Sequence, residues 1–367
     1  TPMRPEAVEA MLPFMTEVFA NPSGSHRFAR QARKSIDEAR DVIADAIGCK
    51  PGEIVFTGCG TESDNTAITG VIRRTPGVAV CSATEHHAVL HCVEHANGVV
   101  VGVNELGTVD LEALQAALSP EVASVSVMAV NNETGAITDL AAVSKIVRRY
   151  APQAMLHTDA VQAACWIDLR TIWPLVDTMA LSAHKFGGPK GVGALIVRPG
   201  IPLTARQLGG GQERERRSGT QNVPGIVSMV TAARLAAEER VTEISRIGSL
   251  RDQLLDGLLA ALPGTIETAG ADRSNRAAGI AHLCIPGVES EALLFLLERG
   301  EVSASAASSC ASGAMQSSHV LAAMGIESDL ARGSLRLSLG WSSTQADVDE
   351  ALTVIPPAVE QLRKFGF

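Results

Sequence analysis

The stretch that decides the fold is "EIVFTGCGTESDNTAITGVI", residues 53–72, in which a short apolar run leads directly into a helical one. The same order recurs further along: "VAVCSAT" leads to "EHHAVLHCVEHA" and "VSVMAVN" to "DLAAVSKIVRRY", before "MLHTDA", "TMALSA" and "ALIVRP". Strand followed by helix, repeated, is typical of a mainly parallel sheet with helices on both faces. We therefore predict an α/β fold from about 50 to 200, with ligands outside the carboxyl ends of the strands.

The pattern changes after a helical stretch at about 223–262. The segments "TIETAG", "IAHLCIP", "VSASAA" and "SLRLSLG" resemble strands, and they are interleaved with helices expected near 289–299, 317–325 and 344–363. A smaller α+β domain is expected here. The predicted division is an N-terminal segment at 1–15 packed with the small domain, a large domain at 16–249 and a small C-terminal domain at 250–367.

Composition restricts the class of protein. The chain has 367 residues, 46% of them hydrophobic, and a net charge of −9, which opposes nonspecific binding to a phosphate backbone. Seven cysteines form an odd set without paired spacing and no signal peptide is visible, which favours free thiols in a reducing cytoplasm. No uncharged apolar run approaches the ~18 residues of a membrane span. The abrupt start "TPMRPEAVEA" leads us to expect a short preceding piece.

The stretch "MALSAHKFGGPKGVGAL" places Ser182, His184 and Lys185 at the end of a predicted strand, followed by glycines. A lysine in such a place can be partly desolvated and then forms an imine with an aldehyde. The alternative is an exposed lysine in a glycine-rich turn. In "LHTDAVQAA", Asp159 closes another predicted strand, where it could pair with a pyridinium nitrogen or simply cap a helix.

A phosphate cradle is indicated by "FTGCGTESDN". Gly58, Gly60 and Thr61 would bring backbone N–H groups to the start of a helix, whose dipole favours an anion, although an ordinary turn looks the same.

Histidines follow in "TEHHAVLHCVEH". His87, His91 and His95 would share one helix face, where a solvated polar face is favoured over a metal site. His86, directly after the strand, can stack on a flat ring and move protons.

Two further segments carry candidate ligands. Arg336 lies in the middle of the apolar run "SLRLSLG", where a buried guanidinium needs either a substrate carboxylate or an internal Asp or Glu. Asn132 in "NNETG" is a ligand or an ordinary turn residue. The stretch "GGGQERERRSGT" is a solvated charged loop or a loop whose final Thr220 reaches a phosphate.

Taken in order, these segments resemble the cysteine desulfurases, pyridoxal-phosphate enzymes of the class V aminotransferase group within the fold-type I superfamily. The resemblance extends over nearly the whole chain and is carried by "HRFARQAR", "GTESDN", "TEHHAVL", "VNNETG", "DAVQ", "SAHKFGGPKGVGAL", "GGGQERERRSGT", "SSCAS" and "SLRLSLG". Any one of these motifs is weak evidence, whereas their ordered sum is strong.

The resemblance implies a role for each matched residue. Lys185 would bond to the aldehyde of pyridoxal 5'-phosphate, Asp159 would pair with the ring nitrogen, and Gln162 would donate a hydrogen bond to the phenolic oxygen. Phosphate ligands would be Gly60, Thr61, Ser182 and His184, with His86 stacked on the ring and Asn132 and Arg336 holding the amino-acid end of the substrate. Thr220 would reach the phosphate bound by the other subunit, so that a homodimer is implied.

Cys310 matches the family's catalytic cysteine, and its neighbours are Ser, Ala and Gly, which leave a nucleophilic sulfur accessible. The family pattern in this loop is Ser-Ser-Gly-Ser-Ala-Cys, whereas residues 306–309 here contain no glycine. Because glycine supplies backbone freedom, we expect the segment to continue the strand "VSASAA" and to hold Cys310 more rigidly.

The implied activity is removal of sulfur from L-cysteine, giving L-alanine and a persulfide on Cys310 for an acceptor protein in the cytoplasm. A selenocysteine lyase or an aminotransferase of the same fold stays open as an alternative. A non-catalytic metal-binding scaffold is the alternative from another class. The acceptor is not identified by the sequence, because iron–sulfur assembly, tRNA thiolation, cofactor synthesis and sulfur modification of DNA all draw on such persulfides. Direct nucleic-acid binding and membrane association are not expected.

Overall fold

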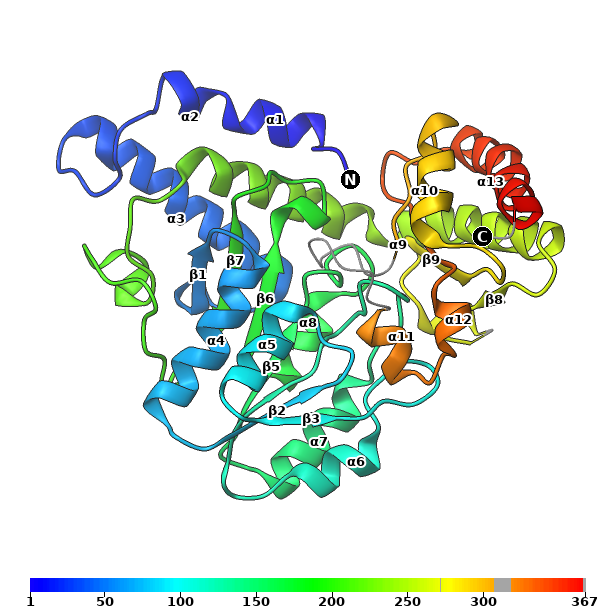
Figure 1. Ribbon diagram of the computed structural model, residues 1–367. Helices are drawn as coiled ribbons and strands as arrows, with labels where there is room; N and C mark the ends of the chain where they lie inside the picture. The colour runs from blue at the N-terminus through cyan, green and yellow to red at the C-terminus, as the bar shows by residue number, and fades with distance from the viewer. Residues whose placement is uncertain (271, 307–317, 366–367) are drawn as a thin grey trace. The chain divides into compact units, whose positions relative to one another are not determined.

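The computed structural model describes residues 1–270, 272–306 and 318–365 (Figure 1). The chain divides into two compact units. Unit 1 comprises Thr1–Val101, Leu111–Ala129 and Thr138–Arg240, and unit 2 comprises Gly102–Asp110, Val130–Ile137 and Val241–Phe367. Within the described residues, no helix is both long enough and apolar enough to cross a membrane.

Unit 1 contains a seven-stranded sheet in the order β1-β7-β6-β5-β4-β2-β3. The strands are β1 (Ile54–Thr57), β2 (Val78–Ser82), β3 (Val99–Val101), β4 (Val122–Ser126), β5 (Met155–Asp159), β6 (Thr178–Ser182) and β7 (Gly193–Val197). Neighbours from β6 to β3 are parallel, whereas β7 is antiparallel to both β6 and β1. Every residue of β4, β5, β6 and β7 is buried, which requires cover on both faces of the sheet. The predicted mainly parallel α/β fold is confirmed.

The helices of unit 1 are α1 (Pro5–Met11), α2 (Pro13–Thr16), α3 (Arg27–Ile47), α4 (Gly60–Arg74), α5 (His87–His95), α6 (Leu111–Ala117), α7 (Leu140–Tyr150), α8 (Leu169–Ile172) and the first part of α9 (Val223–Ala261). Helix α4 packs against six of the seven strands. Its Ala67 joins a core cluster with Val55 and Leu195, and its Ile68 packs in another with Val89 of α5. This burial fixes the helix that begins at the predicted phosphate cradle.

The N-terminal segment contacts residues of unit 1. The Arg4 N–H donates to the carbonyl oxygen of Gly187 at 2.8 Å, and the Arg4 guanidinium pairs with Glu239 at 2.7 Å. Gly187 has φ +87°, and a β-carbon on it would lie 2.7 Å from Arg4 Cγ, so the turn after Lys185 needs glycine to admit Arg4. The expected packing of residues 1–15 with the small domain stays a prediction. The expected boundary at 249/250 stays a prediction, and the chain enters unit 2 within α9.

Unit 2 has a three-stranded antiparallel sheet in the order β10-β9-β8, with β8 (Ile266–Glu267), β9 (Ile280–Cys284) and β10 (Ser334–Ser338). Its helices are the rest of α9, α10 (Ser290–Arg299), α11 (His319–Ala323), α12 (Ser328–Ala331) and α13 (Gln345–Phe365). Cys284, Leu321 and Met324 pack in one of its core clusters. The strand expected at "VSASAA" is reduced to one bridge, between Ser305 and Arg336, over the described residues 302–306.

Candidate active site

Three segments of unit 1 meet at the start of α4. A β-carbon on Gly60 would lie 2.6 Å from Val161 Cγ2 and 3.5 Å from Ser182 Cβ, so only glycine permits this contact. Val161 follows Asp159 after β5, and Ser182 ends β6 just before Lys185. The structure therefore brings the predicted phosphate cradle together with the segments that carry Asp159 and Lys185.

The groups beside the start of α4 fit an anion. Ser182 Oγ is buried and has no hydrogen-bond partner among the described residues, while Thr61 is exposed as the second residue of the helix. Burial and the nearby charge of Lys185 lower the pKa of His184 to about 4, so its ring is neutral at pH 7. A buried hydroxyl without a partner is costly, and a helix N-terminus favours negative charge. A phosphate here would satisfy both.

Asp159 ends β5 and is 6% exposed. Its carboxylate accepts a hydrogen bond from the Val161 N–H at 2.8 Å. Burial and the carboxylate of Asp64 raise the pKa of Asp159 to about 7, although the hydrogen bond from Val161 and the charges of His157 and the half-buried Lys185 act in the opposite direction. A cationic ring nitrogen would stabilise the ionised form of Asp159, so the residues present fit pyridoxal phosphate at both of its polar ends.

Three other predicted cofactor ligands have defined positions. His86 caps α5, and its Nδ1 accepts a hydrogen bond from the Ala88 N–H at 3.1 Å, which leaves Nε2 as the protonated nitrogen of a neutral ring. Gln162 is half-buried in the turn after β5, and Thr220 is exposed at the end of its loop. The structure therefore fixes the ring of His86 most closely.

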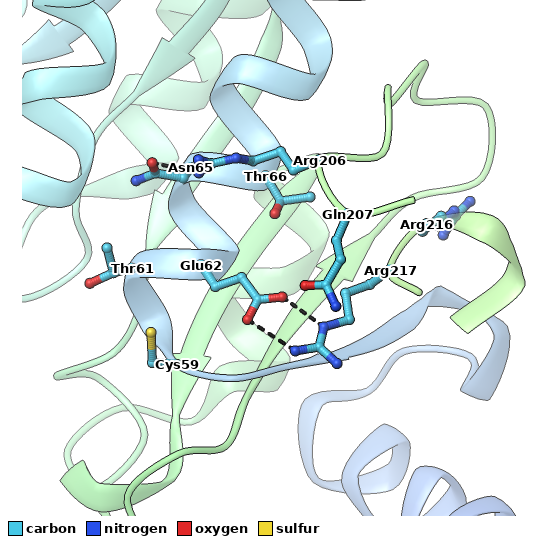
Figure 2. Close-up of a pocket in the computed structure, with 9 residues that line it drawn as sticks. All are labelled: Cys59, Thr61, Glu62, Asn65, Thr66, Arg206, Gln207, Arg216 and Arg217. Carbon is cyan, nitrogen blue, oxygen red and sulfur yellow. Dashed lines mark hydrogen bonds and ion pairs between the residues drawn. The ribbon is translucent and has the colours of Figure 1, made fainter. Parts of the chain in front are cut away.

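A cavity of about 540 Å³ opens beside the first turns of α4, and Figure 2 shows the residues that line it. Arg217 Nε donates to Glu62 Oε1 at 2.8 Å, and the other oxygen of Glu62 accepts from the Gly58 N–H at 2.7 Å. The Gly58 N–H, which the sequence assigned to the phosphate, is thus taken by a carboxylate. Glu62 is the third residue of α4, where an acidic side chain often reaches back to the preceding turn, so position alone could have indicated this.

The two predicted substrate ligands meet within unit 2. Arg336 Nη1 donates to the carbonyl oxygen of Asn132 at 3.0 Å, and Arg336 Nε is buried without a partner among the described residues. Burial raises the pKa of Glu133 to about 7, while its hydrogen bond from Ser318 and the charge of Arg336 act in the opposite direction. No ion pair joins Arg336 to a carboxylate in the described part of the chain. The guanidinium thus retains an N–H without an acceptor among the described residues.

Buried acidic residues behind Asp159 were missed by the sequence analysis. Asp64 of α4 lies 3.1 Å from His157 of β5, and Glu85 accepts a hydrogen bond from the Met128 N–H at 2.7 Å. His157 precedes Asp159 by two residues and therefore shares its face of the strand, which is the signal that could have found it.

The histidine face of α5 lines a second cavity, of about 570 Å³, together with Arg73 and Arg206. The rings of His87 and His91 lie 4.8 Å apart between centroids. No group of three or more metal-ligating side chains is found within the described ranges, so nothing there supports the scaffold alternative.

Cys310 lies outside the described residues. The other six cysteines form no disulfide, and burial raises the pKa of Cys49 and of Cys284 to about 12. These two groups are therefore unreactive thiols at neutral pH.

Comparisons with known proteins agree with this geometry. A family model described as aminotransferase class-V matches residues 1–351. The "IscS-like cysteine desulfurase" of Mycobacterium tuberculosis is 42% identical over 99% of this chain and 95% of its own length. A solved "NifS-like protein" superposes with a TM-score of 0.91 at 32% identity, covering 98% of this chain and 97% of that one.

A structure described as SspA in complex with cysteine has a TM-score of 0.79 at 29% identity, with 92% of this chain and 96% of that chain covered. The match over nearly the full length of both chains excludes a likeness confined to one common domain. This chain therefore belongs to the cysteine desulfurases of the class-V aminotransferase family.

Proposed function

We propose that this chain, with pyridoxal 5'-phosphate as cofactor, converts L-cysteine to L-alanine and leaves the sulfur as a persulfide on Cys310. The atoms balance, because cysteine and one thiol give alanine and one persulfide. The observation that carries the proposal is the meeting of Gly60, Val161 and Ser182, which joins an anion site to the segments bearing Asp159 and Lys185.

The residues of unit 1 bind the cofactor in this proposal. Ser182 Oγ, the hydroxyl of Thr61 and the neutral ring of His184 donate hydrogen bonds to the phosphate. Asp159 holds the protonated ring nitrogen through a charge-assisted hydrogen bond, which favours the ionised carboxylate. Gln162 donates to the phenolic oxygen, and His86 covers the ring face.

Lys185 carries the covalent bond to the cofactor and then moves the substrate's Cα proton with its ε-amine. Bound pyridoxal phosphate supplies a ring that withdraws electrons from the substrate's α-carbon. The positive charge of Lys185 lowers the pKa of both Asp159 and His184, which supports a role for its amine beside these two groups.

Arg336 and Asn132 bind the amino-acid end of the substrate. The unpartnered Arg336 Nε supports this role, because a carboxylate would give the guanidinium a second hydrogen bond and a counter-charge. The side chain of Asn132 is available because the contact with Arg336 uses its backbone oxygen. Cys310 receives the sulfur and passes it to an acceptor protein.

Replacing Cys310 by Ala and by Ser tests the sulfur-transfer role. Both variants should keep the yellow cofactor and lose cysteine-dependent alanine formation, because no other group is assigned to take the sulfur. Cys49→Ala, which removes a thiol of raised pKa, is the matched control and should keep its turnover. Full alanine formation in both Cys310 variants would reject the sulfur-transfer role of Cys310. Unchanged turnover of cysteine without this thiol would favour an aminotransferase.

A homodimer is the second part of the proposal, with Thr220 reaching the phosphate bound by the other subunit. The exposure of Thr220 supports it, since the side chain is open to another chain. Light scattering should give twice the 38.3 kDa mass of the chain, and a monomer that binds cofactor with full affinity would reject this part.

A further inference from the structure

A chain of buried polar groups runs behind Asp159, from α4 through β5 to β6. His157 Nε2 lies 3.1 Å from Asp64 Oδ1, and His157 Nδ1 lies 2.8 Å from Thr178 Oγ1. Thr178 Oγ1 in turn lies 3.4 Å from Met155 Sδ. The side chains of His157 and Asp64 are 0% and 1% exposed, so solvent cannot supply or remove hydrogen bonds here.

The surroundings of this chain are rich in carboxyl groups. The charge of Asp64 raises the pKa of both Asp159 and Glu85, and that of Asp159 raises the pKa of Glu85. The charge of Glu85 raises the pKa of the buried Cys81 thiol, and that of Asp64 raises the pKa of Cys92. The charges of His157 and Lys185 both lower the pKa of Asp159, and because burial lowers the pKa of His157 to about 4, Lys185 is the positive side chain in the described part of unit 1 that acts on Asp159 at neutral pH. Three ionised carboxylates in such a region would repel one another at a cost that one lysine cannot offset.

We propose that Asp64 is protonated and hydrogen-bonded to a neutral His157, and that the pair positions Asp159 as the one ionised carboxylate facing the cofactor. This inference rests on the proposed function, because it assigns Asp159 to the ring nitrogen. Asp64 and His157 are positioning residues, since they act through Asp159.

When Asp64 is protonated and His157 is neutral, each hydrogen-bond donor of the chain has an acceptor. The Asp64 O–H donates to His157 Nε2, the His157 Nδ1–H donates to Thr178 Oγ1, and the Thr178 O–H points to Met155 Sδ as a weak acceptor. Burial supports this assignment, because it raises the pKa of Asp64 well above its usual range and lowers the pKa of His157 to about 4. An ionised Asp64 would instead place a second negative charge beside Asp159.

The pair also ties the two ends of the cofactor site together. Asp64 lies one turn after Gly60, where α4 begins, and His157 lies two residues before Asp159 on β5. The bond between them therefore fixes the start of α4 relative to the end of β5. A cofactor held by its phosphate at the start of α4 and by its ring nitrogen at the end of β5 needs a constant distance between these two places.

The first test locates the proton by ¹⁵N NMR of histidine-labelled protein, with His157→Gln used for assignment. We expect a neutral His157 ring that carries its proton on Nδ1 from pH 5.5 to 8. A proton on Nε2, or on both nitrogens, overturns the proposal.

The second test measures the dissociation constant of pyridoxal phosphate from the apo protein by absorbance titration. Asp64→Asn keeps a neutral donor to Nε2, so its dissociation constant should lie within about 3-fold of that of the unmodified protein. The pH at which binding is half-maximal should also be the same. Asp64→Ala leaves Nε2 without its donor and should bind about 10-fold more weakly, as expected for a buried unsatisfied group costing about 1–3 kcal/mol.

Ser228→Ala is the matched control, because it also removes a buried hydrogen bond of unit 1, from Ser228 Oγ to the Ala7 carbonyl, and should leave the affinity unchanged. The proposal fails if Asp64→Asn weakens binding as much as Asp64→Ala, or if Asp64→Ala binds as tightly as the control. Unmodified apo protein that takes up no pyridoxal phosphate would instead reject the proposed function.

Discussion

The incompletely paired groups of the candidate site have opposite charge in unit 1 and in unit 2. In unit 1, Asp159 has two carboxyl neighbours, Asp64 and Glu85, and Lys185 as the positive group that acts on it. In unit 2, Arg336 is held by one backbone oxygen and keeps a buried Nε without a partner over the described residues. Each unit thus leaves a charged group incompletely paired, and the missing partner is a cation in unit 1 and an anion in unit 2. In the function proposed above, unit 1 therefore binds the cofactor and unit 2 binds the amino-acid end of the substrate.

Lys185→Ala should give the largest effect, because it removes the group that bonds to the cofactor and moves the proton. Alanine formation should fall at least about 10⁴-fold, the combined scale of covalent and acid–base catalysis. Borohydride reduction of the holoenzyme followed by peptide mapping should find the cofactor on residue 185 in the unmodified protein alone. A stable adduct on another lysine would contradict the assignment of unit 1.

Arg336→Leu tests the anion site of unit 2. The KM for cysteine should rise roughly 100-fold, because loss of a charged hydrogen-bond partner costs about 3 kcal/mol, while the affinity for pyridoxal phosphate should not change. Arg332→Leu, at a side chain that is 61% exposed, is the control and should leave KM unaltered. An equal loss of cofactor affinity in Arg336→Leu would remove the distinction between the two units.

Glu133→Gln tests how a buried carboxyl group of unit 2 makes the stability of the protein depend on pH. Burial raises the pKa of Glu133 from an ordinary value of 4.5 to about 7, so the folded protein keeps a proton that the unfolded chain has lost. Stability should therefore fall as pH rises from about 4.5 to about 7, and Gln should abolish this part of the decline. Urea unfolding gives the free energy of unfolding of the variant and of the unmodified protein at each pH. The difference between the two should favour the variant by about 1–3 kcal/mol more at pH 8 than at pH 4.5. A difference independent of pH would show that Glu133 is not protonated in the fold.

The smallest effect is expected for Glu215→Gly in the loop that ends at Thr220. Glu213, Arg214 and Glu215 follow one another with φ of 48°, 57° and 64°, a left-handed conformation that costs non-glycine residues about 1 kcal/mol each. Glycine at 215 should raise the unfolding midpoint by the equivalent of about 1 kcal/mol or less, since glycine also loses more entropy on folding. Glu215→Ala retains a β-carbon and should give no such gain.

Local pattern was sufficient for much of the fold, and it singled out candidate residues for the site. Alternation of apolar strands and amphipathic helices predicts the parallel sheet, because each strand buried on both faces must be apolar throughout. Asp159 was singled out as a candidate because it ends a buried strand, and Lys185 because it lies in the turn after another. The antiparallel β7 could not be predicted in this way, since a buried antiparallel strand has the same composition as its parallel neighbours.

Long-range pairings explain what the sequence analysis missed. Glu62 takes the Gly58 N–H while paired with Arg217, a residue 155 positions away. Arg4 likewise pairs with Glu239, a residue 235 positions away. Partners so far apart in the sequence leave no recognisable local motif.

The sequence by itself determined the family, the order of strands and helices in the α/β domain, and the chemical type of each candidate ligand, because these depend on residue identity and short periodicity. Only the tertiary structure decided which polar groups share a buried space. The pairing of Asp64 with His157, the unpartnered Ser182 Oγ and the unpartnered Arg336 Nε depend on burial and on contacts between distant segments. Charge and protonation follow from that shared environment, so they cannot be deduced from any one stretch of the chain.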